Sequence, residues 1–203
     1  MSRDDPRNNP RNNPRTDEDQ QLVAKIATGD GQAFETLFQE YGERVFRYAC
    51  RLISDAQKAE EVTNDVMMQV WKNAAKFEGR SKVSTWILGI TRHVALNAVR
   101  GKKLATQDID QTAPIADEAI SAEVEKDREQ LKAGLRSALV KLSVEHRDVI
   151  ELTFFHDCSY KEIAEIVGCP ENTVKTRMFH AKKQLQGILS GQNLSLATVE
   201  VAS

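Results

Sequence analysis

The stretch YKEIAEIVGCPENTVKTRMFHAKKQL, from Tyr160 to Leu185, has the pattern of two short helices joined by a tight turn. The first helix is marked by an apolar stripe of helical period, made of Ile163, Ala164 and Val167. Gly168 follows where a left-handed backbone would end that helix. Pro170 suits the first turn of the second helix, where its missing N–H costs nothing.

The second helix of this pair is predicted to have one buried side and one polar side. Apolar residues recur at i, i+4, i+7 and i+11 and are expected to face the core: Val174, Met178, Ala181 and Leu185. At about 100° per residue, the side chains that point away are Asn172, Thr176 and Lys183, with Thr173, Arg177 and His180 on the flank. Short polar and basic groups on a helix opened by a glycine turn suit reading of the DNA major groove. The alternative is an ordinary amphipathic hairpin whose basic face is only solvated.

The composition of the chain narrows the classes of function. Its 203 residues are enough for one or two domains, and its formal charge of −2 argues against a generally basic nucleic-acid coat. DNA binding fits this charge only if positive and negative residues are segregated along the chain. The amino terminus has no signal-peptide core, and no window approaches the roughly 18 apolar residues of a membrane span. We therefore expect neither secretion by a signal peptide nor insertion into a membrane.

The three cysteines, Cys50, Cys158 and Cys169, are too few and too scattered for a disulfide framework. His156 and Cys158 lie near Cys169 in the sequence, but no CxxC or paired HxxxH motif accompanies them. We expect reduced, buried thiols in a cytoplasmic protein, and no metal or other cofactor. Thiol-based sensing is the alternative role for these residues.

The amino-terminal part is predicted to be a tail followed by a helical domain. Residues 1–16 contain the repeat PRNN twice and nothing apolar to bury, so we expect them to be disordered. From Asp17 onward the apolar residues keep helical spacing, and Gly29 is expected to stop a first short helix. Ser54 and Asp55 are suited to cap a later one.

The predicted helix Glu60–Lys76 is apolar over more than half of its circumference. Its buried line is expected to be Val62, Val66, Val70 and Ala74, and the apolar surface is widened by Met67, Met68 and Trp71. Two explanations fit this excess equally well. The surface is kept for a partner protein, or the helix is central and packed on several sides.

Charge is segregated along the middle of the chain. Lys76–Lys103 has seven basic residues and one acidic residue, a local charge of +6, whereas Leu104–Gln130 has two basic and eight acidic residues, a local charge of −6. The basic segment, with Trp86 and His93, suits contact with phosphates and stacking on unpaired bases. The acidic segment, which contains Pro114, is predicted to be a linker.

Helices are expected on both sides of that linker. A polar break, Phe77–Thr85, is predicted to lead into a helix over Trp86–Arg100, capped by Ser84 or Thr85. The buried side of that helix is predicted to be Trp86, Ile90, Val94 (or Ala95) and Ala98. After the linker, apolar stripes are formed by Leu131, Leu135, Leu139 and Leu142, and then by Val149, Ile150, Leu152, Phe154 and Phe155. The tail after Ile188 is expected to be frayed.

Two separate parts of the chain resemble one protein family. The segments AFETLFQEYGERVFRYACRLISDAQKAEEVTNDVMMQVWKNAAKF and STWILGITRHVALNAVR look like the amino-terminal core and promoter-melting domain of bacterial extracytoplasmic-function (ECF) sigma factors of the sigma-70 family. The segment LVKLSVEHRDVIELTFFHDCSYKEIAEIVGCPENTVKTRMFHAKKQL is similar to their carboxy-terminal domain, which reads the −35 promoter element. The resemblance implies an all-α fold with two small helical domains, residues 17–103 and 130–187, joined by a flexible acidic linker over 104–129.

The resemblance also implies roles for particular residues. The helix Glu60–Lys76 matches the surface that binds the clamp helices of the RNA polymerase β′ subunit, and its candidate contacts are Glu61, Asp65, Gln69 and Trp71. The loop 77–84 and the helix after it match the element that opens the −10 region and holds an everted base. Its candidate residues are Arg80, Lys82, Ser84, Trp86, Arg92, His93, Asn97 and Arg100.

The helix Glu171–Lys183 matches the −35 recognition helix of the family. Its candidate residues are Asn172, Thr173, Lys175, Thr176, Arg177, His180 and Lys183. Arg177 and Lys175 would mainly hold phosphates, while base edges are within the reach expected of Thr173, Thr176 and His180. The chain departs from the family pattern at His93 and Asn97, where Asn and Asp are usual, and at His180, where arginine is frequent. At these positions the resemblance implies the general role but not a particular −10 or −35 sequence preference.

The implied function is that of an alternative sigma factor, which binds core RNA polymerase and promoter DNA and has no catalytic chemistry of its own. The resemblance further implies a cognate anti-sigma factor, and a cytoplasmic location or retention at the membrane by a membrane-bound anti-sigma factor. The alternative is a stand-alone helix-turn-helix regulator that binds DNA without polymerase. An enzyme is disfavoured because the chain has no GxSxG, HExxH or Walker motif, and its histidines are scattered: His93, His146, His156 and His180.

Overall fold

The computed structural model describes residues 14–53, 55–105, 134–135 and 137–190. Every secondary-structure element in these ranges is helical, which confirms the predicted all-α class. The described residues divide into two compact units, one formed mainly by residues 14–105 and the other mainly by residues 134–190. Within these ranges, none of the helices combines the length and the apolar composition of a membrane span. Nearly all of the predicted acidic linker and most of both predicted tails lie outside the described residues.

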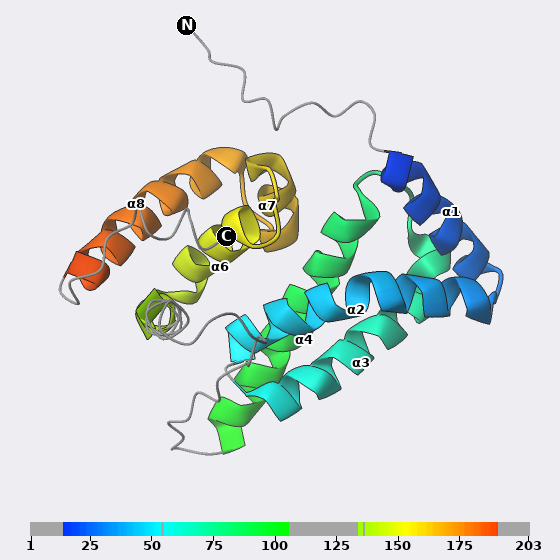
Figure 1. Ribbon diagram of the computed structural model, residues 1–203, viewed down its shortest axis with the longest axis horizontal. Helices are drawn as coiled ribbons and strands as arrows, with labels where there is room; N and C mark the ends of the chain where they lie inside the picture. The colour runs from blue at the N-terminus through cyan, green and yellow to red at the C-terminus, as the bar shows by residue number, and fades with distance from the viewer. Residues whose placement is uncertain (1–13, 54, 106–133, 136, 191–203) are drawn as a thin grey trace, which may run out of the picture. The chain divides into compact units, whose positions relative to one another are not determined.

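The first unit is a helical bundle, shown in Figure 1. Its elements are α1 (Pro14–Ala27), α2 (Gly31–Ile53), α3 (Ala56–Asn73), the 3-10 helix η2 (Ala74–Lys76) and α4 (Val83–Ala105). Helices α2, α3 and α4 pack against one another, and α1 packs on α2, η2 and α4. The core between them is formed by fully buried side chains that include Leu37, Tyr48, Val66, Met67, Ile87 and Leu88.

Helix α1 begins earlier than the sequence pattern suggested. Pro14, Arg15 and Thr16 were expected to belong to a disordered tail, but they form the first turn of α1. The prediction was wrong because proline is compatible with the first helical turn, where no N–H is needed. Gly29, with a φ of +90°, ends the helix as expected, and its N–H donates to the Ile26 carbonyl.

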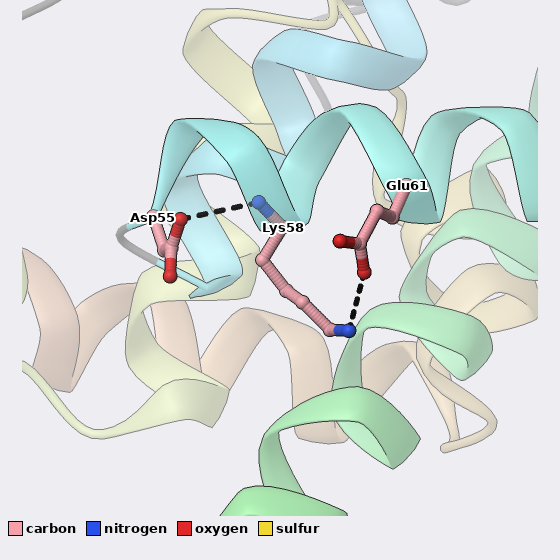
Figure 2. A network of polar contacts seen from close by, with 3 residues as sticks. All are labelled: Asp55, Lys58 and Glu61. Atoms are coloured by element: carbon pink, nitrogen blue, oxygen red, sulfur yellow. Dashed lines mark hydrogen bonds and ion pairs between the residues drawn. The ribbon is translucent and has the colours of Figure 1, made fainter.

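Helix α3 begins at a capping residue that the sequence predicted. The Asp55 carboxylate accepts a hydrogen bond from the Lys58 backbone N–H at 3.1 Å, as Figure 2 shows. The expected buried line, Val62, Val66, Val70 and Ala74, is confirmed. The predicted helix Glu60–Lys76 is not uniform, however, because its last turn is the 3-10 helix η2.

Helix α4 differs from its prediction in its start and in its buried face. It begins at Val83, so Ser84 and Thr85 lie inside the first turn and neither caps the helix. The Lys82 carbonyl accepts the first helical hydrogen bond, from the Trp86 N–H at 3.1 Å. The buried residues are Val83, Thr85, Ile87, Leu88, Thr91 and Ala95, whereas Trp86, Ile90, Val94 and Ala98 are half-buried. Of the residues predicted to be buried, only Ala95, which was given as the alternative to Val94, is buried. The prediction failed elsewhere because α4 packs against both α2 and α3, and these contacts decide which side of α4 is buried.

The second unit contains α6 (Val144–Phe154), most of α7 (Tyr160–Val167) and α8 (Glu171–Ser190), with α6 packed against α8. The Ser143 hydroxyl caps α6, accepting from the His146 N–H at 3.3 Å. The predicted leucine stripe is buried at all of its described positions, Leu135, Leu139 and Leu142. Of the next predicted stripe, Phe155 is exposed and lies just after α6.

The carboxy-terminal end of the second unit is longer than expected. Helix α8 continues to Ser190, although the tail after Ile188 was expected to be frayed. Leu189 is only 2% exposed, so one more apolar contact extends the helix beyond the predicted end.

Candidate nucleic-acid interface

The hairpin of α7 and α8 is built by local hydrogen bonds. The Ser159 N–H donates to the Glu162 carboxylate at 2.8 Å, and the Glu162 N–H donates back to the Ser159 hydroxyl at 3.3 Å, which forms a capping box at the start of α7. Gly168 has a φ of +70°, as the sequence predicted. Pro170 was predicted to lie in the first turn of the second helix, but it lies one residue before the start of α8. Its carbonyl accepts a hydrogen bond from the Val174 N–H at 3.2 Å.

The buried side of the hairpin agrees with the sequence in α8 and only partly in α7. All four residues predicted to be buried in α8 are buried: Val174, Met178, Ala181 and Leu185. In α7 the buried residues are Ile163 and Ile166, while Ala164 and Val167 are half-buried. A helix of eight residues has too few turns for its periodicity to define the buried face well.

The outward side of α8 carries the side chains predicted to meet DNA. Exposed residues of that set are Asn172, Lys175, Thr176, His180 and Lys183, and half-buried ones are Thr173 and Arg177. The Lys175 ammonium forms an ion pair with Glu171, 2.7 Å away, one turn earlier. The Arg177 guanidinium lies 3.7 Å from the Cys169 sulfur, which places it beside the turn.

Phe179 is an exposed residue of this surface that was not among the predicted DNA contacts. It is 66% exposed, the largest exposure among the large apolar side chains of the described residues. It lies three residues after Thr176 and four before Lys183, and so on the same side of the helix. Its ring contacts His180 edge-on, with centroids 5.4 Å apart, while the His180 ring stacks on His146 at 6.5 Å. The sequence feature that could have identified Phe179 is its position outside the predicted buried stripe of α8, where an aromatic residue is expected to be exposed.

In the first unit, the loop between η2 and α4 holds part of the second predicted DNA surface. Phe77 and Trp86 stand at the ends of this loop with ring centroids 4.8 Å apart. Gly79 has a φ of +68°, and the exposed Arg80 forms an ion pair with Glu78. Lys82 is exposed in the loop, and Ser84 is half-buried inside α4.

The remaining residues of that surface lie along α4. Arg100, His93 and Asn97 are exposed and Arg92 is half-buried. The Asn97 amide nitrogen lies 3.3 Å from Nε2 of His93, one turn earlier, so these two departures from the family pattern contact each other.

A groove of about 680 Å³ runs between α3 and α4 and brings together residues from two predicted surfaces. From α3 it is lined by Lys58, Glu61, Asp65 and Gln69, and from α4 by His93 and Asn97. Three of the four predicted polymerase contacts therefore border two of the predicted −10 residues. The Lys58 ammonium bonds to the Glu61 carboxylate at 2.5 Å, a contact that raises the pKa of Lys58 (Figure 2).

The fourth predicted polymerase contact, Trp71, does not line this groove. It is half-buried on α3, where its ring packs edge-on against Phe34 of α2 with centroids 5.2 Å apart. Of the residues that widen the apolar surface of α3, Met67 is in the core and Met68 is 48% exposed. The apolar excess therefore divides between core packing and exposed surface.

The cysteines show no arrangement of a metal centre. Cys50 and Cys158 are buried and Cys169 is half-buried, and all three are free thiols. Burial raises the pKa of Cys50 to about 11, which keeps this thiol protonated. Among the described residues, no three His, Cys, Asp or Glu side chains are grouped so as to hold a metal ion.

Comparison with protein families gives two matches, one in each unit. The family "Sigma-70 region 2" matches residues 37–104, and the family "Sigma-70, region 4" matches residues 132–185. The first match contains α3, the loop and nearly all of α4. The second contains α6, α7 and most of α8.

Curated relatives match across most of their length. The RNA polymerase sigma-H factor of Pseudomonas aeruginosa is 28% identical over 182 residues, which cover 85% of this chain and 94% of that protein. The ECF RNA polymerase sigma factor RpoE of Cereibacter sphaeroides is 32% identical over 162 residues, which cover 79% of this chain and 88% of that protein.

Solved structures with a similar fold include a sigma factor. The sigma factor RpoE of Bartonella quintana, solved with the anti-sigma factor NepR, is 25% identical with a TM-score of 0.64, covering 77% of this chain and 96% of that one. CnrH, solved with the cytosolic domain of CnrY, has a TM-score of 0.65 and covers 85% of this chain and 97% of that one. Its identity of 21% supports similarity of fold alone.

Proposed function

This chain belongs to the ECF sigma factors of the sigma-70 family, and on that premise we propose which of its surfaces performs each step of transcription initiation. It is an alternative sigma factor that directs initiation at promoters. The observation that carries the proposal is the outward side of α8, where polar, basic and aromatic side chains gather behind a glycine turn.

The second unit, in this proposal, grips duplex DNA at the −35 element through α8. Arg177 and Lys175 hold phosphates, so they contribute affinity that depends on salt rather than on sequence. Thr176 and Asn172 face outward and have hydrogen-bonding groups for base edges. Phe179 adds an apolar contact of the kind that recognises the methyl group of thymine.

The first unit opens the −10 element through the loop and α4. An everted base needs a pocket and a stacking partner that offset the loss of stacking in the duplex. The Phe77–Trp86 pair lies at the base of the loop, and Arg80 and Lys82 place positive charge on it. Along α4, Arg92 and the other basic residues supply charge for the displaced strand.

Helix α3 docks on the β′ clamp helices of core polymerase. Glu61 and Asp65 are exposed on α3, and the partner surface is accordingly expected to be basic beside them. Met68 adds exposed apolar surface on the same helix. A cognate anti-sigma factor would compete for these surfaces, in the cytoplasm or at the membrane. No catalytic step belongs to this chain.

Reconstituted transcription tests the proposal against a stand-alone regulator. Core polymerase alone and core polymerase with this protein are compared on genomic DNA, and the transcripts are sequenced. The proposal expects new start sites that share −10 and −35 motifs and that appear only with the protein. Tight DNA binding by the chain without any polymerase-dependent start site would favour the stand-alone regulator.

The surfaces are separated by variants in the same assay. Asp65→Arg is expected to abolish initiation and polymerase binding while the protein stays folded. Glu43→Arg, at an exposed position of α2 remote in sequence from α3, is the charge-matched control. Equal loss of polymerase binding in both variants would exclude α3 as the specific docking surface.

A further inference from the structure

Helix α1 lies beside the loop that is proposed to capture the everted base. A Cβ atom placed on Gly79 of this loop would lie 3.8 Å from the side-chain nitrogen of Gln20 in α1. Helix α1 also packs on η2, which precedes the loop, and on α4, which follows it. In Figure 1, α1 (blue) lies at the end of the bundle where α3 passes through η2 to α4. One helix therefore borders the loop and both elements that carry it.

A buried hydrogen bond holds α1 in this position. The Tyr41 hydroxyl of α2 donates to the Asp19 carboxylate of α1 at 2.5 Å, and both residues are 7% exposed. Burial, followed by the bond to Asp19, raises the pKa of Tyr41, so the phenol stays protonated as the donor. Val23 and Ile26, one and two turns further along α1, are buried in the core. Gln20 is thus the neighbour in sequence of an anchored residue.

The tip of the loop is exposed to solvent. Glu78, Gly79 and Arg80 are exposed, and the ion pair between Glu78 and Arg80 is a surface pair, which contributes little. Gly79 adds conformational freedom where the backbone is left-handed. A site that must accept one base benefits from being formed in advance, because ordering a loop on binding weakens affinity. Contact with the neighbouring helix α1 would keep the loop ordered before the base binds.

We infer that α1 is a positioning element for base capture: Gln20, on a helix anchored by the Asp19–Tyr41 hydrogen bond, holds the loop 77–82 in the shape that accepts the everted base. This inference rests on the proposed function of the loop. Gln20 does not touch the base itself. It acts through Gly79 and the backbone around it.

The chain offers a matched control for this role. Gln21 is the next residue of α1 and is exposed, whereas Gln20 is half-buried. Gln20→Ala and Gln21→Ala remove the same chemical group from adjacent positions of one helix, so their effects on helix propensity and on net charge are equal. Only Gln20→Ala removes the side chain beside the loop.

The test measures base capture as a ratio. Core polymerase with this protein binds a fluorescent oligonucleotide that carries the non-template −10 strand of a promoter found by transcript sequencing. The ratio is the dissociation constant for a strand with one abasic position divided by that for the intact strand, and it is measured for each position in turn. Partial unfolding weakens binding of intact and abasic strands equally, so it leaves the ratio unchanged.

The wild-type protein is expected to lose at least about fivefold in affinity at the captured position. Gln20→Ala should reduce that ratio by about threefold, the size of one lost side-chain contact, while Gln21→Ala keeps the wild-type value. Tyr41→Phe should act like Gln20→Ala, because it removes the donor to Asp19. Asp19→Asn, which keeps an oxygen acceptor, should retain more of the ratio than Tyr41→Phe.

Two contrary outcomes are distinguishable. If wild type discriminates one position but Gln20→Ala and Tyr41→Phe discriminate it equally well, the positioning role of α1 is wrong and base capture by the loop stands. If wild type shows no sensitive position, base capture by this protein is itself wrong, and the role of α1 falls with it.

Discussion

Phe77 and Trp86 close the base of the loop between η2 and α4, with ring centroids 4.8 Å apart and ring planes inclined at 35°. One residue follows η2 and the other lies in the first turn of α4, so the contact joins the two ends of the loop. The contact between the two rings therefore sets the distance between the end of η2 and the start of α4, which the loop must span. It also places an aromatic surface beside the basic residues proposed to meet the −10 strand.

Replacing Phe77 by leucine should remove the ring contact and keep most of the apolar volume. We expect the first unit to lose about 1 kcal/mol of stability, the usual worth of an aromatic pair beyond its burial. Promoter opening should fall as well, measured by permanganate reactivity of unpaired thymines. Phe77→Tyr keeps the ring and should behave like wild type in both measurements. If wild type and Phe77→Leu open the promoter equally well, the Phe77–Trp86 contact has no role in promoter melting.

Arg177→Ala should weaken DNA binding to a similar extent on all sequences, because a phosphate contact carries no sequence information. The slope of log affinity against log salt should become shallower by about 1. Fluorescence anisotropy across a salt series measures this slope on a −35 duplex and on an unrelated duplex. Arg177→Lys keeps the charge and should restore the slope. An unchanged slope in Arg177→Ala would place this guanidinium away from phosphate.

Phe179→Ala should instead change sequence preference. If the exposed ring contacts a thymine methyl, replacing that thymine by deoxyuridine weakens wild-type binding by about 1 kcal/mol and leaves Phe179→Ala unaffected. A set of −35 duplexes, each with one deoxyuridine, locates the position. Phe179→Leu retains an apolar contact and should keep part of the effect. Equal sensitivity of wild type and Phe179→Ala at every thymine would refute this contact.

Gly168→Ala should destabilise the α7–α8 hairpin through the backbone alone. A Cβ at this position would meet no atom within 4 Å, so the cost comes from the φ of +70° and should be about 1–2 kcal/mol. Gly187 lies inside α8 with equally open surroundings and no positive φ. Gly187→Ala should therefore stabilise by about 0.5–1 kcal/mol. Thermal unfolding of both variants checks the opposite signs.

Cys50 should make stability depend on alkaline pH. Burial raises the pKa of its thiol from 9.0 to about 11 in the folded protein, so the unfolded thiol ionises first. The contribution of Cys50 is complete below about pH 9 and is lost as the pH rises from there to about 11. The difference in free energy of unfolding between wild type and Cys50→Ala isolates it from other titrating groups. A difference that is constant over this range would show that Cys50 is not desolvated.

Much of the candidate site follows from local sequence, and parts of it do not. The outward direction of Asn172, Thr176 and Lys183 was predictable because the buried stripe of α8 is long and regular. Phe179 was missed because aromatic residues are usually counted toward a core, and only the folded helix shows its exposure. The shared groove of Glu61, Asp65 and His93 joins helices that are distant in sequence, so no local pattern contains it.

The sequence by itself determined the helices that depend on short-range effects. Gly168 ends α7 because only glycine adopts a left-handed backbone without strain, and Asp55 starts α3 because its carboxylate accepts from a free N–H. Tertiary structure alone decided the start and buried face of α4 at Val83 and the placement of Gln20 beside Gly79. Those features depend on which sides the other helices cover, and burial against several neighbours outweighs the weak preferences of a local segment.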